Sequence, residues 1–387
     1  MSGRVRVRLV PVADANHDPG LLRSWAELER GALEPNPFFA AEMVLPAARH
    51  LDDGASVLLL VAESDGALVF LLPVAEGAGI RGRSFSGLRS WMHDYCFLGT
   101  PLLSPHGEPD QILTAIFAEL RRSRLGPLLL MPLHSTDGLV AAALGRADAQ
   151  AGLGVRRSPA RHRGFVRRRP EPTYALEWMS RKHRANFARR RRDLGRQLGT
   201  EVSVVERAAA DPGQAIEQFL RLEASGWKGR TGTALLRRPG HDRFFREMSM
   251  EFADHGRLMF LSLQAGTRVL AQNTALLAGA GLFGFKRAYD EAFARWSPGA
   301  LLDLDVLAWF HERRQLRFLD TCSSPEDRPG GQIFGDRRTL CTLAVPFSPL
   351  GSAAAAMLAP TVRARRYLLD SRAGRIVREY RHLQHRD

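Results

Sequence analysis

One stretch in the second half of the chain combines residue types that could hold a phosphate group. Bulky residues alternate with smaller or more polar ones from Leu282 to Tyr289, which predicts a β-strand that ends at Asp290. Ser297, Pro298 and Gly299 then supply a capping hydroxyl, a proline suited to a first helical turn and a glycine that lets backbone approach a ligand. The first N–H groups of such a helix would point at the loop mouth, where a phosphate is well received. The alternative is an ordinary crossover helix.

A glycine-rich loop follows a helix predicted from Ala215 to Gly226. The segment from Gly226 to Thr233, GWKGRTGT, places three glycines, two cations and two hydroxyl groups around Trp227. This composition is typical of a loop that binds a ligand. Equally, Trp227 could fill the core while the loop merely turns the chain.

The positive charge of the sequence is concentrated in one segment. Of a net charge of +14, the residues from Arg161 to Arg196 contribute +10, from thirteen Lys or Arg and three acids. Ser180 is suited to cap a helix that would run to about Gly199 with cations on most faces. Such a helix would attract CoA phosphates, a phosphorylated substrate, anionic lipid or RNA. The alternative is a solvated surface helix, which is also the expectation for the basic tail from Thr361 to Asp387.

Length and composition are those of a globular protein with more than one domain. The 387 residues, of which 45% are hydrophobic and 25% charged, suffice for two domains that each bury a core. The three cysteines lack the spacing of a zinc knuckle or a redox pair, so we expect no metal site. We also expect the protein to reside in the reducing cytoplasm. The N-terminal strand lacks a signal-peptide core, and no apolar run reaches the roughly 18 residues that a transmembrane helix needs.

The order of predicted elements repeats in the two halves. The first half carries three strands, a helix and a strand, at 57–63, 67–74, 95–103, 109–122 and 128–133. The second half carries the same order, at 257–263, 268–277, 282–289, a helix from Ser297, and 316–320. A basic linker at 164–172 joins them. Five elements in one order predict two copies of one α/β unit.

Antiparallel strands, a glycine-bearing loop, a helix and a further strand are the core order of the GNAT acyltransferase fold. The stretch YDEAFARWSPGALLDLDVLAWFHERRQLRFLD resembles the signature of the GNAT branch known as BioF2-like or CelD/BcsL-type acetyltransferases. The segments SRKHRANFARRRRDLGRQLG, SGWKGRTGT and HDYCFLGTPLL are also similar to that branch. The tandem arrangement is similar to FemABX-type transferases, which join two GNAT-like domains and use one cofactor site. One departure follows Asp320, where many members have a Gly-rich stretch that ends in a Tyr-Lys pair, and where Arg337 and Arg338 could replace that lysine.

The resemblance implies an α/β fold of two tandem GNAT domains with mixed, mostly antiparallel sheets flanked by helices. It divides the chain into an N-terminal GNAT-like domain without cofactor at 1–165, a basic linker and helix at 166–200, and a C-terminal GNAT domain with the acyl-CoA site at 201–387. The first domain has Ser104-Pro105-His106-Gly107 in place of a Ser-Pro-Gly helix start, so it is expected to shape the acceptor cleft.

In the family, an amine attacks the thioester of acyl-CoA directly. This reaction requires that the amine and the thioester are placed together, that a proton is removed from the amine, and that a donor stabilises the oxyanion. The implied cofactor-binding residues are Lys286, Arg287, Ser297, Pro298, Gly299, Ala300 and Leu301, with the oxyanion donor an N–H between Lys286 and Tyr289. Asp290 is the first candidate for the base, with capping of its loop as the alternative role, and Asp320 is the second. Tyr289 could donate to the leaving thiolate.

The acceptor would lie near the glycine-rich loop. Trp227, Lys228 and Arg230 are the implied substrate-binding residues, together with Glu223, which is also a weaker candidate for the base. With Lys286, the two cations could bind an acidic acceptor or CoA phosphates, or they could be surface charge. Cys322 offers a covalent acyl-cysteine route as a minor alternative.

We therefore predict a cytoplasmic acyltransferase that moves an acetyl group from acetyl-CoA to an amine on a sugar, peptide or small metabolite, without a metal. One alternative is a FemABX-like transferase that takes an aminoacyl group from tRNA, bound by the basic helix at 181–196. Another alternative, from a different class, is a non-catalytic nucleic-acid-binding or polysaccharide-regulatory protein.

Overall fold

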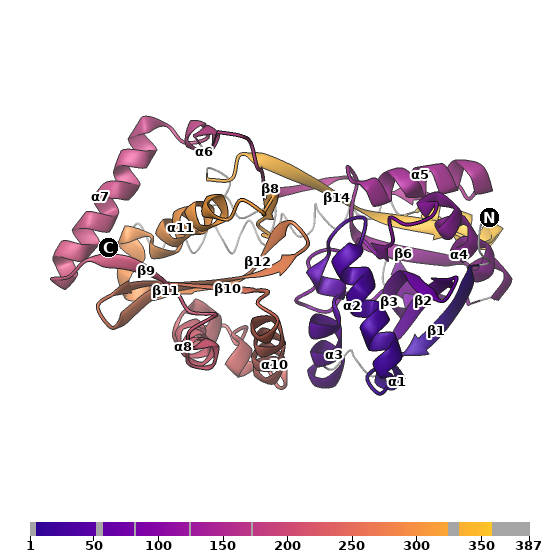
Figure 1. The fold of residues 1–387 in the computed structure, drawn as a ribbon, viewed down its shortest axis with the longest axis horizontal. Helices are drawn as coiled ribbons and strands as arrows, with labels where there is room; N and C mark the ends of the chain where they lie inside the picture. Colours follow the sequence, from indigo (N-terminus) through magenta and orange to yellow (C-terminus); the bar gives the residue numbers. More distant parts are fainter. Residues whose placement is uncertain are drawn as a thin grey trace.

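The computed structural model describes residues 5–51, 57–80, 83–123, 125–171, 173–323 and 333–357. Within these residues, fourteen strands form one continuous sheet along the molecule, with helices on both faces (Figure 1). The predicted α/β fold with a mixed, mostly antiparallel sheet is therefore confirmed. The basic tail from Thr361 to Asp387 lies outside the described residues.

The first half of the chain builds one end of the sheet. Its strands are β1 (Arg6–Pro11), β2 (Leu58–Ser64), β3 (Ala67–Ile80), β4 (Arg83–Ser90), β5 (Leu102–Leu103), β6 (Leu128–Ser135), β7 (Arg156–Arg157) and β8 (Arg161–Arg167). Its helices are α1 (Val12–Ala15), α2 (Pro19–Gly31), η1 (Pro37–Phe39), α3 (Ala41–His50), α4 (Pro109–Ser123) and α5 (Leu139–Ala151). Strands β1 to β4 are antiparallel neighbours in order, and β6 lies parallel to β4.

The second half builds the other end with the same topology. Its strands are β9 (Val202–Glu206), β10 (Leu258–Ala265), β11 (Arg268–Ala278), β12 (Gly281–Tyr289), β13 (Phe318–Asp320) and β14 (Asp336–Pro346). Its helices are α6 (Tyr174–Glu177), α7 (Arg181–Leu198), α8 (Pro212–Ser225), α9 (Trp227–Arg230), η3 (Leu235–Arg237), α10 (His241–Asp254), η4 (Glu291–Trp296), α11 (Pro298–Glu312) and α12 (Pro349–Ala356). Strands β9 to β12 are antiparallel neighbours, and β13 lies parallel to β12, so the predicted repeat is present.

Helix boundaries follow capping residues that the sequence shows directly. The Ser180 hydroxyl accepts from the N–H of His183 at the start of α7, and Gly199 ends that helix with a left-handed φ of 66°. Asp211 caps α8 in the same way, since its carboxylate accepts from the N–H of Gln214 at 3.0 Å. Capping residues thus place both helices where the sequence predicts them.

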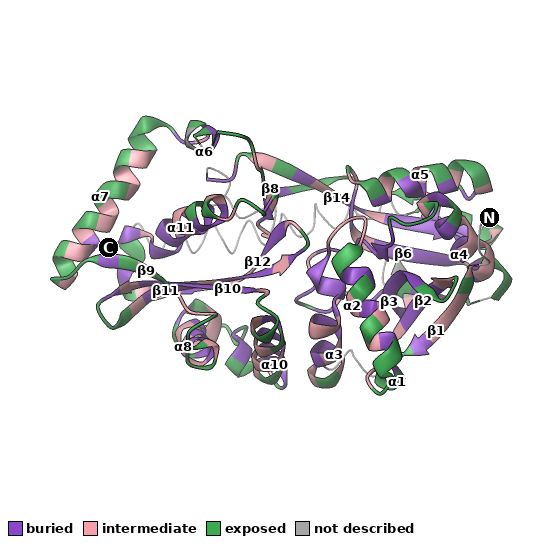
Figure 2. Cartoon of the chain, in the orientation of Figure 1, coloured by how far each residue is buried: buried purple, intermediate pink, exposed green. Residues whose placement is uncertain are grey.

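Alternate residues of the central strands face two different helix layers. Along β10, Phe260 packs into the core shared with α8 and α10, whereas Met259 and Leu261 pack into the core beneath α11. The first of these cores continues into the first half, where it includes residues of α2 and α3. Figure 2 shows the buried residues along these strands between the two helix layers. The two halves therefore share part of one hydrophobic core.

The two halves also exchange strands where they meet. The order along the sheet at this point is β6-β14-β8-β13, so β14, the last strand among the described residues, pairs with the first half. Conversely, β8, which precedes α7, pairs with β13 through Phe165 and Asp320. The division of the chain into domains at 1–165, 166–200 and 201–387 stays a prediction. Strand β8 runs across the boundary between the first two of these segments.

Two predicted local structures are wrong. Between Tyr95 and Pro101 the chain is irregular, and only Leu102–Leu103 pairs with β3, because the N–H of Cys96 instead turns back to the carbonyl of His93. The expected linker at 164–172 begins within β8, whose backbone bonds to strands on both sides. A local turn thus interrupts the first segment, and tertiary strand pairing decides the structure of the second.

Candidate active site

Strands β12 and β13 are parallel neighbours over a short distance only. They pair at Gly281–Phe283 and Phe318–Asp320. Next to this pairing, Gly284 passes so close to the following loop that a Cβ atom there would lie 2.5 Å from the carbonyl oxygen of Thr321. Past this point the strands no longer pair, and a cavity of about 480 Å³ opens.

Residues from several elements line this cavity, which we call the splay pocket. They include Asn273 and Ala275 of β11, Lys286, Arg287 and Tyr289 of β12, Asp303 and Val306 of α11, and Thr321, Cys322 and Ser323 after β13. The glycine-rich loop contributes Trp227 and Lys228, and the first half contributes Phe97. A pocket between parting strands thus combines residues from both halves of the chain.

A β-bulge lies in the strand that forms one wall of the splay pocket. Thr274 of β11 pairs with Lys286 and Ala275 pairs with Gly284, so Phe285 is an extra residue in β12. The hydroxyl of Thr274 accepts from the N–H of Lys286 at 3.1 Å and donates to its carbonyl at 3.2 Å. The N–H of Lys286, one of the predicted oxyanion donors, is therefore already engaged.

The predicted phosphate loop lies where the sequence places it, at the start of α11. Ser297 has a left-handed φ of 54°, and its hydroxyl accepts from Nη1 of Arg190, in α7, at 2.7 Å. A Cβ atom on Gly299 would lie 3.6 Å from the side chains of Arg287 and Tyr289, so these side chains stand against the helix start. Of the predicted cofactor-binding residues, Arg287, Ser297, Pro298 and Gly299 thus come together.

Part of the predicted loop is engaged within the protein. The N–H groups of Ala300 and Leu301 donate to the carbonyl of Ser297 at 2.9 and 3.0 Å. The side chain of Leu301 is buried in the core beneath α11. A phosphate at this place would therefore depend on the N–H of Gly299, the hydroxyl of Ser297 and the guanidinium of Arg190.

A cluster of opposite charges borders the splay pocket on the side of α8. Oε1 of Glu223 accepts from Nζ of Lys228 at 2.9 Å and from Nζ of Lys286 at 3.0 Å, while Oε2 accepts from the N–H of Leu235 at 2.9 Å. Burial alone would raise the pKa of Glu223, but the two ammonium groups outweigh it and hold the pKa below its ordinary value. Burial lowers the pKa of Lys286, and the neighbouring Lys228 lowers it further.

Asp290, the first candidate for the base, caps a helix. Its carboxylate accepts from the N–H of Ala292 at 3.0 Å at the start of η4 and pairs with Arg268 at 3.0 Å. It is not among the described residues that line the splay pocket. The structure thus shows the capping role that the sequence offered as the alternative, and a role for Asp290 as base stays a prediction.

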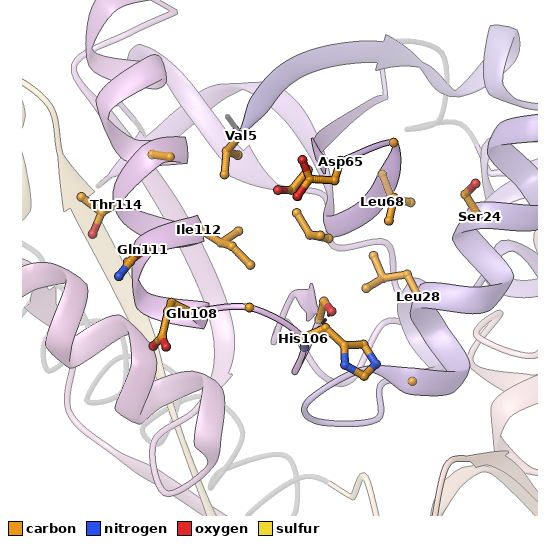
Figure 3. Close-up of a pocket in the computed structure, with 18 of the residues that line it drawn as sticks. Val5, Ser24, Leu28, Asp65, Leu68, His106, Glu108, Gln111, Ile112 and Thr114 are labelled. Atoms are coloured by element: carbon orange, nitrogen blue, oxygen red, sulfur yellow. Dashed lines mark hydrogen bonds between the residues drawn. The ribbon is translucent and has the colours of Figure 1, made fainter. Parts of the chain in front are cut away.

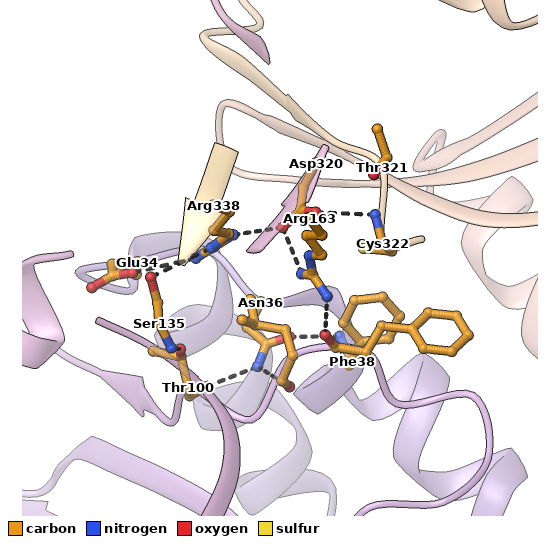
Figure 4. A network of polar contacts seen from close by, with 12 residues as sticks. Glu34, Asn36, Phe38, Thr100, Ser135, Arg163, Asp320, Thr321, Cys322 and Arg338 are labelled. Carbon is orange, nitrogen blue, oxygen red and sulfur yellow. Dashed lines mark hydrogen bonds and ion pairs between the residues drawn. The ribbon is translucent and has the colours of Figure 1, made fainter. Parts of the chain in front are cut away.

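Asp320, the second candidate, is fully buried between two guanidinium groups (Figure 4). Its Oδ2 accepts from Arg163 at 2.6 Å and from Arg338 at 2.9 Å, and its Oδ1 accepts from the N–H of Cys322 at 3.0 Å. Burial alone would raise the pKa of Asp320, but both guanidinium groups hold the pKa below its ordinary value. A carboxylate stabilised in this way is a weak base, so the contacts favour a role in joining strands.

The network around Asp320 continues into the first half. Nη1 of Arg163 donates to the carbonyl of Phe97 at 2.5 Å, and Arg338 lies 3.5 Å from the carboxylate of Glu34 (Figure 4). Arg338, expected to replace a lysine of the family pattern, is thus a buried structural residue. We call Arg163, Asp320, Arg338 and Glu34 the seam network, because it ties the exchanged strands together.

Cys322 lies at the wall of the splay pocket with a left-handed φ of 50°. Strained backbone of this kind gathers at functional sites, and Ser297 provides a second example beside the same site. Burial raises the pKa of the Cys322 thiol well above its ordinary value, and Asp320 adds to the effect. A thiol kept protonated is a poor nucleophile, so the acyl-cysteine route is not favoured.

The first half has a larger pocket of its own, of about 1200 Å³, bordered by α2, the β2–β3 turn and the start of α4 (Figure 3). Its lining includes the carboxylates of Glu27, Asp65 and Glu108, and the imidazole of His106. Among its described lining residues there is neither lysine nor arginine. This acidic pocket is unsuited to the phosphates of CoA.

Sequence reasoning missed several residues of the site. Phe97 lines the pocket and Arg163 bonds to its carbonyl and to Asp320, yet both precede the second half, so only the tertiary structure places them there. Asn273 and Asp303 could have been found, because strand and helix periodicity from Ala275 and Leu307 places them on the same faces. Their contact, Asn273 Nδ2 to Asp303 Oδ1 at 3.4 Å, and the ion pair of Asp303 with Arg287 needed the structure.

Two further findings concern the described part of the chain as a whole. It contains no group of three His, Cys, Asp or Glu side chains placed to hold a metal ion. None of its helices is long and apolar enough to cross a membrane.

The pocket, the bulge and the helix start can now be set beside known proteins. Residues 181–327 match the family model described as an acetyltransferase (GNAT) domain. The match covers α7 to β13 and thus the start of α11 and the residues that line the splay pocket, apart from Phe97 and Phe334. No curated protein sequence matches the chain.

Solved structures match over nearly the whole chain. The structure of FemX covers 86% of this chain and 98% of its own, with a TM-score of 0.58 and 7% identity. A conserved protein of unknown function from Bacteroides thetaiotaomicron covers 88% and 100%, with a TM-score of 0.54 and 11% identity. A tandem GNAT protein from the clavulanic acid biosynthesis pathway covers 89% and 99%, with a TM-score of 0.45 and 14% identity. At these identities the similarity is one of fold. The matches with FemX and with the Bacteroides protein extend over both copies of the repeated α/β topology.

Proposed function

We propose that this chain is an acyltransferase that moves an acyl group, in the first place acetyl, from acyl-CoA to an amine. The observation that carries the proposal is the splay pocket between β12 and β13, next to the start of α11, within the part of the chain that matches the GNAT domain. A parting of parallel strands leaves room for an extended thioester arm between them. The adjacent helix start and Arg190 favour the phosphates at one end of that arm.

The cofactor would be held by few groups. The N–H of Gly299, the hydroxyl of Ser297 and the guanidinium of Arg190 would bind the pyrophosphate. The thioester would reach the bulge at Phe285, where the strand is locally free to present backbone to a ligand. Tyr289, which lines the pocket, would donate a proton to the leaving thiolate.

Direct attack by the amine depends mainly on placement in this proposal. Asp290 caps η4 and Asp320 is bound by two arginines, so neither carboxylate is positioned in the free protein to remove a proton from the amine. Holding amine and thioester together converts a bimolecular step into an intramolecular one, which alone can supply a large part of the rate enhancement.

The proposal is tested by measuring acetyl-CoA binding to a variant whose pocket is filled. Val306, on the pocket wall of α11, is changed to tryptophan, and Leu139, which is 60% exposed on α5 in the first half, is changed to tryptophan as the control. At about 100 times its dissociation constant, acetyl-CoA should stabilise the wild type by roughly 2.7 kcal/mol. The same shift should appear in Leu139→Trp and be absent from a folded Val306→Trp. Absence of any shift with acetyl-CoA, CoA and longer acyl-CoAs in the wild type would contradict the proposal.

Within the GNAT superfamily, we place the chain with the BioF2-like or CelD/BcsL-type branch. The support is the sequence pattern of the Tyr289-Asp290 pair, the Ser-Pro-Gly start of α11 and a strand that ends in Asp320. The acceptor would then be an amine on a sugar, peptide or small metabolite.

A second candidate is transfer of an aminoacyl group from tRNA, and exposed cations on α7 favour it. Arg181, Lys182, Arg189, Arg192 and Arg196 are exposed on this helix, which lies at the edge of the molecule (Figure 2). Binding of tRNA through these side chains should weaken steeply with salt, by an amount set by the number of phosphate contacts. Charge reversal at Arg189 and Arg192 would remove such binding without affecting acetyl-CoA.

A further inference from the structure

The lysines of the Glu223 cluster lie on the opposite face of β12 from the start of α11. Side chains along a strand alternate between faces, so Arg287 and Tyr289 stand against Gly299 while Lys286 points to α8 and the first half. The splay pocket reaches both faces, because it is open where β12 and β13 part, and both Arg287 and Lys286 line it. If phosphates of a cofactor bind at α11, the lysine side is left for the second substrate.

Among the described residues, the charges in this cluster do not balance. One carboxylate, Glu223, is shared by two ammonium groups, those of Lys228 and Lys286, and its second oxygen is taken by a backbone N–H. The side chains are 1%, 26% and 12% exposed, respectively, so a net charge of +1 is held with little contact to water. Burying an unbalanced charge costs free energy that an anionic ligand would offset.

An aromatic ring contacts the ammonium group of Lys286 without neutralising its charge. The ammonium lies 4.9 Å from the centre of the Tyr95 ring, a cation–π contact supplied by the first half. The hydroxyl of Tyr95 is turned away, to Nδ1 of His241 at 2.5 Å. The ammonium of Lys228 uses two of its donors, on Glu223 and on the carbonyl of Arg287 at 3.1 Å. Each ammonium has three donors, so both have capacity for a further acceptor.

We propose that Lys228 and Lys286 together bind an anionic group of the acceptor, so that the acceptor is an amine that also carries a carboxylate or a phosphate. The inference rests on the proposed acyltransferase function and names the substrate class of the same site. Trp227, which is 45% exposed next to Lys228 at the pocket wall, would cover the body of the acceptor. The first half then contributes to acceptor binding through Tyr95.

The experiment compares matched amines that differ in charge. Dissociation constants are measured by calorimetry, with the full chain saturated with CoA, for glycine against glycinamide and for glucosamine 6-phosphate against glucosamine. We expect the anionic member of at least one pair to bind about tenfold tighter or more, as for a hydrogen bond to a charged group. The two pairs distinguish a carboxylate from a phosphate.

Variants assign the preference to the two lysines. Lys228→Met and Lys286→Met should each reduce the preference for the anionic member about tenfold, because each removes one charged donor. Either variant leaves Glu223 with the other lysine and with the N–H of Leu235, so the fold is preserved, which thermal unfolding checks. Arg221→Met, which removes an exposed cation from α8, the helix that carries Glu223, is the matched control and should leave the preference unchanged.

Each other outcome overturns the inference. Equal or absent binding of the anionic and neutral members, or a preference that survives both lysine variants, excludes an anion site at this place. If acetyl-CoA affinity falls about tenfold in the lysine variants, the cluster serves the cofactor's phosphates instead of the acceptor. Failure of the proposed function is seen separately, as absence of acetyl-CoA binding to the wild type.

Discussion

Helices α4 and α11 each follow the third core strand of their half of the molecule, and the side chains at their starts differ in charge. In the first half, Glu108 precedes α4 and Asp110 lies in its first turn. In the second half, Ser297 precedes α11, no acidic residue lies in its described first turn, and Arg190 reaches the Ser297 hydroxyl. A helix start carries partial positive charge. Carboxylates lie at the start of α4, whereas the first turn of α11 has none, and we propose that a cofactor phosphate takes that place.

The pockets beside these helices differ in the same sense. Carboxylates of Glu27, Asp65 and Glu108 line the larger pocket of the first half, and Lys228, Lys286 and Arg287 line the smaller splay pocket. A duplicated fold therefore does not imply a duplicated site. The size of a pocket says less about a phosphate-bearing cofactor than the charge of its lining does.

The largest expected effect concerns the seam network, which limits how far the two halves can be treated as separate units. Asp320→Ala would leave the buried guanidinium groups of Arg163 and Arg338 without their carboxylate. We expect a loss of about 3–5 kcal/mol in the free energy of unfolding, measured with urea, because an unpaired buried charge is costly. Asp137→Ala, at an exposed pair with Arg167, is the control and should cost less than about 1 kcal/mol. Similar losses in both variants would mean that the seam is not a structural centre.

The effect of Asp320→Ala should depend on pH in a definite direction. The pKa of Asp320 is lowered in the folded protein, so the unfolded chain binds more protons at acidic pH. The stabilisation by this carboxylate is fully present above its unfolded pKa of about 4 and is lost as the pH falls toward the folded value. The difference in unfolding free energy between wild type and variant should therefore shrink below about pH 4. A difference that grows in this range would contradict the charge assignment.

A second prediction concerns a variant that gives α11 an acidic first turn like that of α4. Gly299→Asp places a carboxylate in the first turn, where it should repel cofactor phosphates and weaken acetyl-CoA binding by about tenfold or more. Gly299→Ala is the matched control, because its Cβ atom would make only ordinary contacts of 3.6 Å with Arg287 and Tyr289. The thermal stability of Gly299→Asp should not fall, since a carboxylate there favours the helix dipole. Unchanged acetyl-CoA affinity in a folded Gly299→Asp would remove α11 from the cofactor site.

The smallest expected effect separates two uses of α7. Arg190→Ala should weaken acetyl-CoA binding by about fivefold, because the guanidinium next to Ser297 would contact a phosphate. Arg192→Ala, two residues away and exposed, should leave that affinity unchanged. Calorimetry with acetyl-CoA measures both. The alternative outcome is that Arg190→Ala leaves the acetyl-CoA affinity unchanged while Arg192→Ala weakens the binding of a ligand such as tRNA. That outcome would favour binding of a polyanion by the exposed face of α7.

The local elements could be predicted from the sequence because their signals are local. Ser180 and Gly199 mark both ends of α7, and the alternation before Tyr289 marks β12. The Ser-Pro-Gly start of α11 appears at the expected residue. Caps, turns and periodicity depend on neighbours in the chain, so the sequence is sufficient to find them.

The partners of the charged side chains could be decided only by the tertiary structure. Asp320 ends its strand as predicted, but its role depends on Arg163, which is 157 residues away in the chain. Lys286 was predicted to bind the cofactor, yet strand alternation and the position of α8 turn it to Glu223 and Tyr95. The exchange of β8 and β14 between the halves brings such residues together. Strand pairing over this separation leaves no local pattern, because it is selected by burial and hydrogen bonding of the whole sheet.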